Sequence, residues 1–337
     1  MGFIGTVLRT FISIVITFTA MIAPGLMEDC TAPYAPLDSE ECLLNFAAIS
    51  DVHIQSDEGN KLSSAFTDLA QNAIMPGLSA GEERLDAVVI TGDLTENAYE
   101  SQWIKLEGFL KKFDPADEII LAGGNHDTKT RGHGARTSRG LFMQYNKRIT
   151  GRMVSEMYYS TEVNGYPFIV LCSDDDGTSA DFSEKQLKWF KTEMKKAAKK
   201  DLPIFVVCHW PLNQTHGLPV TWGDDEPEPM DGGIGEQSAR IEKILKKYDN
   251  VFLLSGHIHN GFSNAEMEAE TGYQTIESDG SFHSVNLPRI GWVAENGYFM
   301  IGTGYNVEVY ENEVVFRARN YLTNTWCPEF DYTIELV

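Results

Sequence analysis

The chain has 337 residues, 42% of them hydrophobic, and a formal net charge of -22 at pH 7. This length suits one large α/β domain or two average ones. The acidic balance excludes a protein that holds nucleic acid through a broad positive field, because a negative field repels phosphate backbones.

The N-terminus has the pattern of a targeting segment. Arg9 precedes an uncharged apolar stretch from Phe11 to Met27. The stretch is about 17 residues long, at the lower limit for crossing a hydrocarbon core, and it fits the template of a secretory signal. We therefore expect residues 1–27 to be a signal peptide or membrane anchor, and residues 28–44 to be a linker. The protein is then exported: extracellular, periplasmic or membrane-anchored.

Five cysteines leave the redox chemistry open. They form no C-x-x-C pair, which excludes a thiolate zinc ribbon. Cys30 and Cys42 could form a disulfide in an oxidising compartment. Cys172 and Cys208 lie in apolar runs and are expected to be buried thiols, whereas Cys327 has no evident partner.

From residue 45 onward, short apolar runs alternate with amphipathic stretches. The runs are rich in β-branched and aromatic residues and are bounded by turn residues, as buried strands are. They are Phe46–Ile49, Ala87–Ile90, Ile119–Ala122, Phe168–Cys172, Ile204–Cys208 and Val251–Leu254. The stretches predict helices at Lys61–Met75, Ala98–Phe113, Glu184–Lys199 and Glu236–Tyr248, the third with a capping-box start at Ser183 and Gln186. The alternation predicts an α/β sheet covered by helices.

The tail of this 45–337 domain has a different pattern. From about residue 298 to 337, strand-like runs such as Val307–Tyr310 and Val314–Ala318 are joined by a short polar link. Such spacing indicates antiparallel hairpins that complete the sheet.

Polar side chains follow five of the predicted strands at their carboxyl ends. They are Asp51 and His53, then Asp93, then Asn125, His126 and Asp127, then His209, and finally His257 and His259. In open α/β sheets the ligand crevice lies outside the carboxyl ends of the strands. These five segments are therefore expected to meet in one place.

The residue types indicate metal binding. Carboxylates, an amide oxygen and imidazoles form a mixed set that suits Zn, Fe, Mn or Ni better than Ca. The i, i+2 spacing of Asp51 with His53, and of His257 with His259, points both side chains to one side of an extended segment. Two ions that share a bridging carboxylate fit this number of ligands. The remaining histidines, His133, His216 and His283, are expected in exposed loops, although His216 could approach the substrate.

In this order and spacing, the motifs resemble the signature of the calcineurin-like metallophosphoesterases. The resemblance implies a four-layer sandwich in which helices flank two central mixed β-sheets. It assigns Asp51, His53, Asp93 and His259 to a first divalent metal, and Asp93, Asn125, His209 and His257 to a second. It makes His126 the general acid or charge stabiliser and gives Asp127 the task of orienting the His126 ring.

The implied reaction is hydrolysis of a phosphodiester or phosphomonoester by direct attack of a metal-bridging hydroxide. Leu94, Thr95 and Glu96 stand where purple acid phosphatases carry a metal-binding tyrosine. The sequence is therefore closer to the bacterial-type phosphodiesterase and phosphohydrolase branch. The implied partner is a small phosphoester; no stable nucleic acid partner is expected, and membrane association would run through the N-terminal segment.

Several alternatives remain open at this level. A non-catalytic, metal-stabilised interaction protein would be expected to lack His126 or a ligand, and neither is missing. A phosphoprotein phosphatase would share the chemistry but needs an open groove. The basic stretch from Thr128 to Ser155 is either a phosphate-binding patch or a solvated face. Trp210 or Trp222 either stacks on a base or sugar or packs in the interior.

Overall fold

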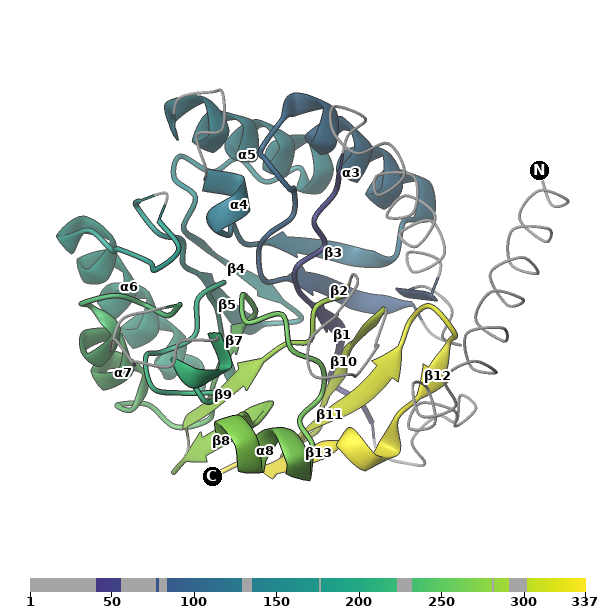
Figure 1. The fold of residues 1–337 in the computed structure, drawn as a ribbon, viewed down its shortest axis with the longest axis vertical. Helices are drawn as coiled ribbons and strands as arrows, with labels where there is room; N and C mark the ends of the chain where they lie inside the picture. The colour runs from purple at the N-terminus through teal and green to yellow at the C-terminus, as the bar shows by residue number, and fades with distance from the viewer. Residues whose placement is uncertain are drawn as a thin grey trace, which may run out of the picture.

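The fold is built on two mixed β-sheets. A computed structural model describes residues 41–55, 77–78, 84–128, 135–175, 177–222, 232–280, 282–290 and 302–337. Within these ranges the strands form a seven-stranded sheet, in the order β12-β11-β10-β1-β2-β3 with β13 paired to β11, and a six-stranded sheet, in the order β4-β5-β6-β7-β9-β8. Figure 1 shows the two sheets and the helices around them.

The first sheet joins both ends of the domain. Its strands are β1 (Leu44–Ile49), β2 (Leu85–Ile90), β3 (Ala116–Leu121), β10 (Thr303–Val309), β11 (Glu313–Asn320), β12 (Thr325–Trp326) and β13 (Tyr332–Glu335). β1, β2 and β3 are parallel, and β10 pairs antiparallel with β1. β11 pairs antiparallel with β10 and with β13, which confirms the predicted C-terminal hairpins.

The second sheet comes from the middle of the chain. Its strands are β4 (Tyr159–Val163), β5 (Tyr166–Val170), β6 (Ile204–Val207), β7 (Val251–Ser255), β8 (Ile276–Asp279) and β9 (Phe282–Asn286). β5, β6, β7 and β9 are parallel, whereas β4 and β8 pair antiparallel with their neighbours. The carboxyl ends of the parallel strands in this sheet therefore share one edge.

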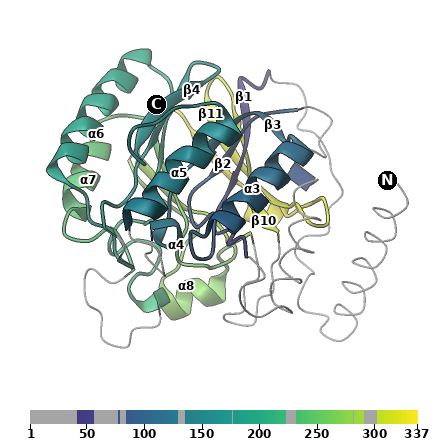
Figure 2. The ribbon, with the colours of Figure 1, turned by 90° about the horizontal axis from the view of Figure 1, so that it is seen from above.

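Helices cover the outer faces of both sheets. The covering helices are α3 (Glu100–Phe113), α5 (Ala135–Thr150), α6 (Glu184–Ala197) and α7 (Ser238–Leu245). The short α4 (Asn125–Thr128) follows β3, and α8 (Ala265–Thr271) packs through Met267 in a separate small apolar cluster. Three 3₁₀ turns lie at Ala198–Lys200, Val220–Trp222 and Pro328–Phe330. Figure 2 shows α3 and α5 running side by side, with α6 and α7 together in another part of the molecule. Helix, sheet, sheet and helix make four layers, which confirms the predicted sandwich.

Strand periodicity explains the layering. Phe46 and Ala48 of β1 point into the apolar cluster between the sheets. Ala47 and Ile49 of the same strand point to the cluster beneath the helices. Because successive side chains of a strand alternate between faces, a strand that is apolar throughout must be covered on both sides.

The predicted elements match the observed ones with small shifts. Three predicted helices appear as α3, α6 and α7, while the one expected at Lys61–Met75 lies outside the described residues. Ser183 caps α6 by accepting from the backbone N–H of Gln186. The reciprocal half of the capping box is absent there, because the Gln186 amide instead accepts from the N–H of Cys172 and donates to its carbonyl oxygen.

The state of the cysteines contradicts the suggested disulfide and confirms the predicted buried thiols. Cys42, Cys172 and Cys208 are free thiols, and the last two are buried as predicted. The suggested pairing of Cys30 with Cys42 is therefore wrong. Cys327 is disulfide-bonded, with a partner outside the described residues. Among the described helices, none has the length and apolar character needed to cross a membrane.

Candidate metal centre

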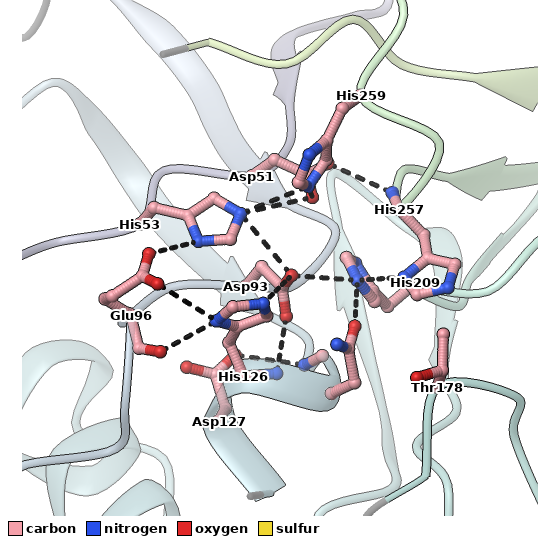
Figure 3. A network of polar contacts seen from close by, with 12 residues as sticks. Asp51, His53, Asp93, Glu96, His126, Asp127, Thr178, His209, His257 and His259 are labelled. Carbon is pink, nitrogen blue, oxygen red and sulfur yellow. Dashed lines mark hydrogen bonds and ion pairs between the residues drawn. The ribbon is translucent and has the colours of Figure 1, made fainter. Parts of the chain in front are cut away.

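The predicted ligand residues meet where the two sheets adjoin. Asp51 and His53 follow β1, Asp93 follows β2, and Asn125 begins α4 after β3. From the second sheet, His209 comes just after β6, and His257 and His259 follow β7. Figure 3 shows the aspartate and histidine side chains of this set pointing toward one another. Each sheet therefore supplies part of one polar cluster.

The backbone reaches this arrangement by a route that the spacing did not predict. The five residues Asp51, His53, Asp93, His257 and His259 have φ values of 55°, 47°, 47°, 74° and 64°. These are left-handed conformations, which non-glycine residues rarely adopt and which cost of order 1–3 kcal/mol each. The inference of an extended segment is wrong, although the paired side chains do converge.

Two glycines allow the loops to approach so closely. A Cβ at Gly124 would lie 2.2 Å from Oδ1 of Asp93, and a Cβ at Gly256 would lie 1.8 Å from Oγ of Ser50. Any larger residue at either position would displace the loop that carries a carboxylate. Gly256 also marks a close contact between the two sheets, because Ser50 follows β1 and Gly256 follows β7.

One half of the cluster contains Asp51, His53, Asp93 and His259. Nε2 of His259 lies 3.0 Å from Oδ1 of Asp51 and 3.2 Å from Nε2 of His53. Nε2 of His53 lies 3.5 Å from Oδ2 of Asp93. This is the first metal set that the family resemblance implies.

The other half contains Asp93, His209 and His257. Nε2 of His209 lies 3.4 Å from Oδ2 of Asp93, 3.2 Å from Nδ1 of His257 and 3.2 Å from Oδ1 of Asn125. With Asn125 included, these residues are the implied second metal set. Asp93 belongs to both halves, as a bridging carboxylate would.

The donor atoms fit divalent metal ions. Donors about 2.1 Å from a shared ion are roughly 3.0–3.4 Å apart, close to the spacings just described. Oδ2 of Asp93 is buried and has no hydrogen-bond partner in the described structure, although three imidazole nitrogens lie 3.4 to 4.0 Å from it. A buried carboxylate oxygen without a partner is costly, and a cation between it and the imidazoles removes that cost.

Hydrogen bonds behind the ligands orient two of the imidazoles. Nδ1 of His53 lies 2.9 Å from Oε2 of Glu96, and Nδ1 of His209 lies 3.2 Å from the Thr91 carbonyl oxygen. Each acceptor fixes the proton on Nδ1 and leaves the Nε2 lone pair directed into the cluster. Metal-binding histidines are commonly held in this way.

The electrostatics of the cluster favour bound positive charge. Burial alone would raise the pKa of Asp51 and of Asp93, but the surrounding imidazoles hold both well below their usual range. Burial works in the opposite sense on His53, yet Asp51 and Glu96 raise its pKa to about 9. The ionised carboxylates therefore stabilise positive charge inside the cluster, and bound metal cations would supply that charge.

His126 lies beside the cluster and remains partly accessible. Its backbone N–H donates to Oδ1 of Asp93 over 2.8 Å, and its Nε2 lies 4.0 Å from Oδ2 of Asp93. Its Nδ1 donates to the carbonyl oxygen of Glu96 over 2.7 Å. The ring is therefore aimed at the centre by the Glu96 backbone.

The prediction that Asp127 orients the His126 ring is wrong. The Asp127 carboxylate instead accepts the backbone N–H groups of Gly124, Leu94 and Thr95, and the Thr95 hydroxyl. These bonds join the loop after β2 to the loop after β3. Asp127 thus supports the backbone that carries Asp93 and Asn125.

Two further residues at this centre, Glu96 and Arg289, were not predicted from the sequence. Glu96 was noted only as a departure from the tyrosine pattern, yet it contacts both His53 and His126. Arg289 follows β9, a strand that was not predicted, and its Nη1 lies 3.4 Å from Nδ1 of His259. A carboxylate three residues after the motif aspartate was the available signal for Glu96; nothing local indicated Arg289.

Other suggested contributors lie elsewhere. His216 is fully buried, not exposed, and His283 is also buried; His133 lies outside the described residues. Trp210 is buried and donates through Nε1 to the Thr178 carbonyl oxygen, which excludes base stacking, and the side chain of Trp222 is not described.

In the described part of the basic stretch, two arginines are neutralised. Arg148 pairs with Glu107 and Arg152 pairs with Glu118. Arg139 donates to the carbonyl oxygens of Ser173 and Asp175. These contacts favour a structural role for the stretch over phosphate binding.

Comparison with known proteins gives one consistent pattern. The family model described as calcineurin-like phosphoesterase matches residues 44–261. A probable cyclic nucleotide phosphodiesterase of Rhodococcus erythropolis is 25% identical over 63% of this chain and 63% of its own length. A probable cyclic nucleotide phosphodiesterase of Fibrobacter succinogenes is 27% identical over 70% of this chain and 80% of its own. A probable glycerophosphodiester phosphodiesterase of Arcobacter nitrofigilis is 24% identical over 63% of this chain and 70% of its own length.

Solved structures support the fold. A dimetal phosphatase from Danio rerio superimposes with a TM-score of 0.56 at 15% identity, over 88% of this chain and all of that one. A purple acid phosphatase from yellow lupin superimposes with a TM-score of 0.56 at 14% identity, over 90% of this chain and 55% of that one. The alignment with the Rhodococcus relative spans less than two thirds of that protein.

Proposed function

The chain belongs to the calcineurin-like phosphoesterase family, and from that premise we propose that it hydrolyses a small-molecule phosphodiester at a dinuclear metal centre. The observation that carries the proposal is the pair of buried donor clusters that share Asp93. Relatives named as phosphodiesterases support the diester over the monoester.

Each half of the centre has a complete donor set for one ion. Asp51, His53 and His259 would hold the first with Asp93, and Asn125, His209 and His257 would hold the second with Asp93. When bound, the ions supply Lewis acidity and make water a nucleophile near neutral pH. The protein's own task is to keep carboxylates ionised and imidazole lone pairs aimed inward, as the distances above show.

His126 is the proposed proton donor to the leaving oxygen. The Glu96 carbonyl oxygen accepts its Nδ1–H, so Nε2 faces the centre next to Asp93. When the ring is protonated, the proton on Nε2 is the one available to the leaving group. The remaining accessibility of the side chain, 17%, leaves room for substrate beside the ring.

The test is hydrolysis by purified protein that is stripped of metal and then reloaded with Mn, Zn, Fe or Ni. The substrates are bis-p-nitrophenyl phosphate and p-nitrophenyl phosphate, followed by cyclic nucleotides and glycerophosphodiesters. We expect metal-dependent turnover with the diester preferred. Absence of turnover on every compound, at about two ions bound per chain, would contradict the proposal and favour a non-catalytic role for the metals.

We also propose that the protein works outside the reducing cytosol. The disulfide at Cys327 supports this, because structural disulfides persist mainly in oxidising compartments. Fractionation of cells that produce the full chain, followed by alkylation of thiols before and after reduction, tests it. Recovery in the cytosol with Cys327 alkylated before reduction would contradict the proposal. Membrane attachment would instead appear as sedimentation with membranes.

A further inference from the structure

Arg289 is held at the metal centre by its backbone. It follows β9 and forms an isolated parallel bridge with Ser50, the residue before Asp51. Its N–H donates to the Asn260 carbonyl oxygen over 3.3 Å, next to His259 in sequence. The next residue, Ile290, donates to the Ser50 carbonyl oxygen over 3.0 Å. Arg289 is thus anchored between the two loops that carry ligands of the first metal set.

The guanidinium of Arg289 has no carboxylate partner in the described structure. Five other described arginines each form an ion pair with a carboxylate: Arg84, Arg148, Arg152, Arg240 and Arg317. Nε of Arg289 is buried and makes no hydrogen bond with a described residue. Arg139 also has no carboxylate contact in the described structure, but its guanidinium donates to two backbone carbonyl oxygens, whereas the guanidinium of Arg289 contacts only Nδ1 of His259.

The hydrogen bond between Nη1 of Arg289 and Nδ1 of His259 cannot persist once His259 binds a metal. Nε2 of His259 faces Asp51, so Nε2 is the atom that would bind the ion. Nδ1 then carries the proton and becomes a donor. Nη1 of Arg289, 3.4 Å from that Nδ1, is also a donor. Two donors cannot satisfy each other, and the guanidinium needs an acceptor from elsewhere.

We propose that Arg289 binds a non-bridging phosphoryl oxygen of the substrate at the first-metal side of the centre. This inference rests on the proposed function and extends it to a substrate-binding residue. A guanidinium presents a planar fork of N–H donors that matches phosphate oxygens, and it stays charged at any working pH. An anionic phosphoryl group is the acceptor that the proposed reaction brings to this place.

The experiment measures binding of inorganic phosphate, the simplest phosphoryl probe, to metal-loaded protein by titration calorimetry. Arg289→Gln is compared with Arg289→Lys and with Arg240→Gln, which removes a surface ion pair with Glu184. We expect the phosphate Kd to rise roughly tenfold to a hundredfold in Arg289→Gln. Arg289→Lys should lie between wild type and Arg289→Gln, and Arg240→Gln should match wild type.

Metal content and steady-state kinetics complete the test. Metal per chain should stay at the wild-type level in all variants, and KM for bis-p-nitrophenyl phosphate should rise more than kcat falls in Arg289→Gln. Unchanged phosphate affinity at full metal content overturns the inference. Loss of metal from Arg289→Gln also overturns it, because Arg289 would then support His259. If Arg289→Gln does not fold, Arg289→Lys decides by the same criteria.

The two proposals fail separately. If wild-type protein hydrolyses no phosphoester but its phosphate affinity falls in Arg289→Gln, the binding role stands while the proposed reaction is wrong. If wild-type protein turns over diesters and phosphate affinity is the same in Arg289→Gln, only the role of Arg289 is wrong.

Discussion

Two of the buried histidines, His209 and His216, lie in contrasting settings: His209 at the metal centre, and His216 in the loop after β6 that packs against β8 and β9. In the second setting, His216 contacts the Gln274 carbonyl oxygen through Nδ1 at 2.6 Å and the Ser284 hydroxyl through Nε2 at 2.9 Å. At the metal centre, Nε2 of His209 faces only other donor atoms of the cluster, at 3.2 to 3.4 Å.

The difference shows what marks a metal ligand. Both His209 and His216 have no exposed surface, so burial does not distinguish them. Each ring nitrogen of His216 already has a complementary partner, whereas the nitrogens at the centre crowd around a carboxylate oxygen that has none. Buried imidazole nitrogens that converge on an oxygen without a hydrogen-bond partner indicate a site for a cation. Buried imidazole nitrogens that already have hydrogen-bond partners indicate a structural histidine.

Replacing Asp93, the carboxylate shared by both donor sets, is expected to have the largest effect and tests whether the unpartnered oxygen marks a metal site. Asp93→Asn keeps the size of the side chain but halves its capacity to bridge two ions. We expect turnover to fall more than about a thousandfold, beyond the roughly 10- to 100-fold that loss of an outer-shell partner costs. Metal analysis of the purified variant should show fewer than two ions per chain. Full metal content with near-normal turnover would exclude Asp93 as the bridge.

Replacing His126 separates proton donation from metal binding. We expect His126→Gln to lower kcat by roughly 10²–10⁴-fold while the metal content stays unchanged, because Nε2 of His126 lies at the edge of the cluster. The loss should be smaller with a p-nitrophenolate leaving group than with an alkoxide, which needs the proton more. Equal losses for both leaving groups would argue against a general acid.

Glu96 tests the support behind the ligands. Glu96→Gln retains an oxygen for Nδ1 of His53 but loses the charge that strengthens that hydrogen bond. We expect the affinity for the first metal to fall roughly 10- to 100-fold, measured by competition with a chelator. Glu266→Gln, at the exposed start of α8, is the matched control. Unchanged metal affinity in Glu96→Gln would contradict a supporting role of the Glu96 carboxylate in metal binding.

His216 gives the smallest effect on activity and a distinct effect on stability. Burial lowers the pKa of folded His216 to about 4 from an ordinary 6.5. The folded state therefore resists a proton that the unfolded chain accepts. Stability is complete above pH 6.5 and is lost as the pH falls toward 4. His216→Gln should lose about 1–3 kcal/mol at neutral pH through its broken hydrogen bonds.

Denaturant unfolding between pH 4 and 7 measures this difference. The variant should show a shallower loss of stability with acid than wild type. Metal content and KM should not change. A fall in metal content would place His216 in the same class as His209 and remove the distinction between the two settings.

The sequence predicted most of the centre because its motifs follow strands that are apolar throughout. Where a strand was recognised, as before Asp51, Asp93, His209 and His257, the side chains at its carboxyl end were placed correctly. Arg289 was missed because β9 reads Phe-His-Ser-Val-Asn, with buried polar residues that conceal the strand. Parallel pairing of β9 with β7 is what brings its carboxyl end to the same edge.

Local pattern was also insufficient to identify roles. Asp127 is next to His126 in sequence, which suggested an orienting contact, but its carboxylate turns to the backbone of the neighbouring loop. The backbone φ values of the ligands could not be read from a two-residue spacing either. Left-handed residues at Asp51 and His257 are imposed by tertiary contacts, such as the bond from the His257 N–H to Oδ2 of Asp51.

The division of the ligands between two sheets has a consequence in polymer terms. Asp51 and His259 are far apart along the chain, yet their donor atoms are 3.0 Å apart. Ions held there act as reversible cross-links that close very long loops, much as a disulfide does. Chelation should therefore loosen the junction between the sheets before either sheet melts. Amide exchange would then quicken first at the strand ends that face the centre.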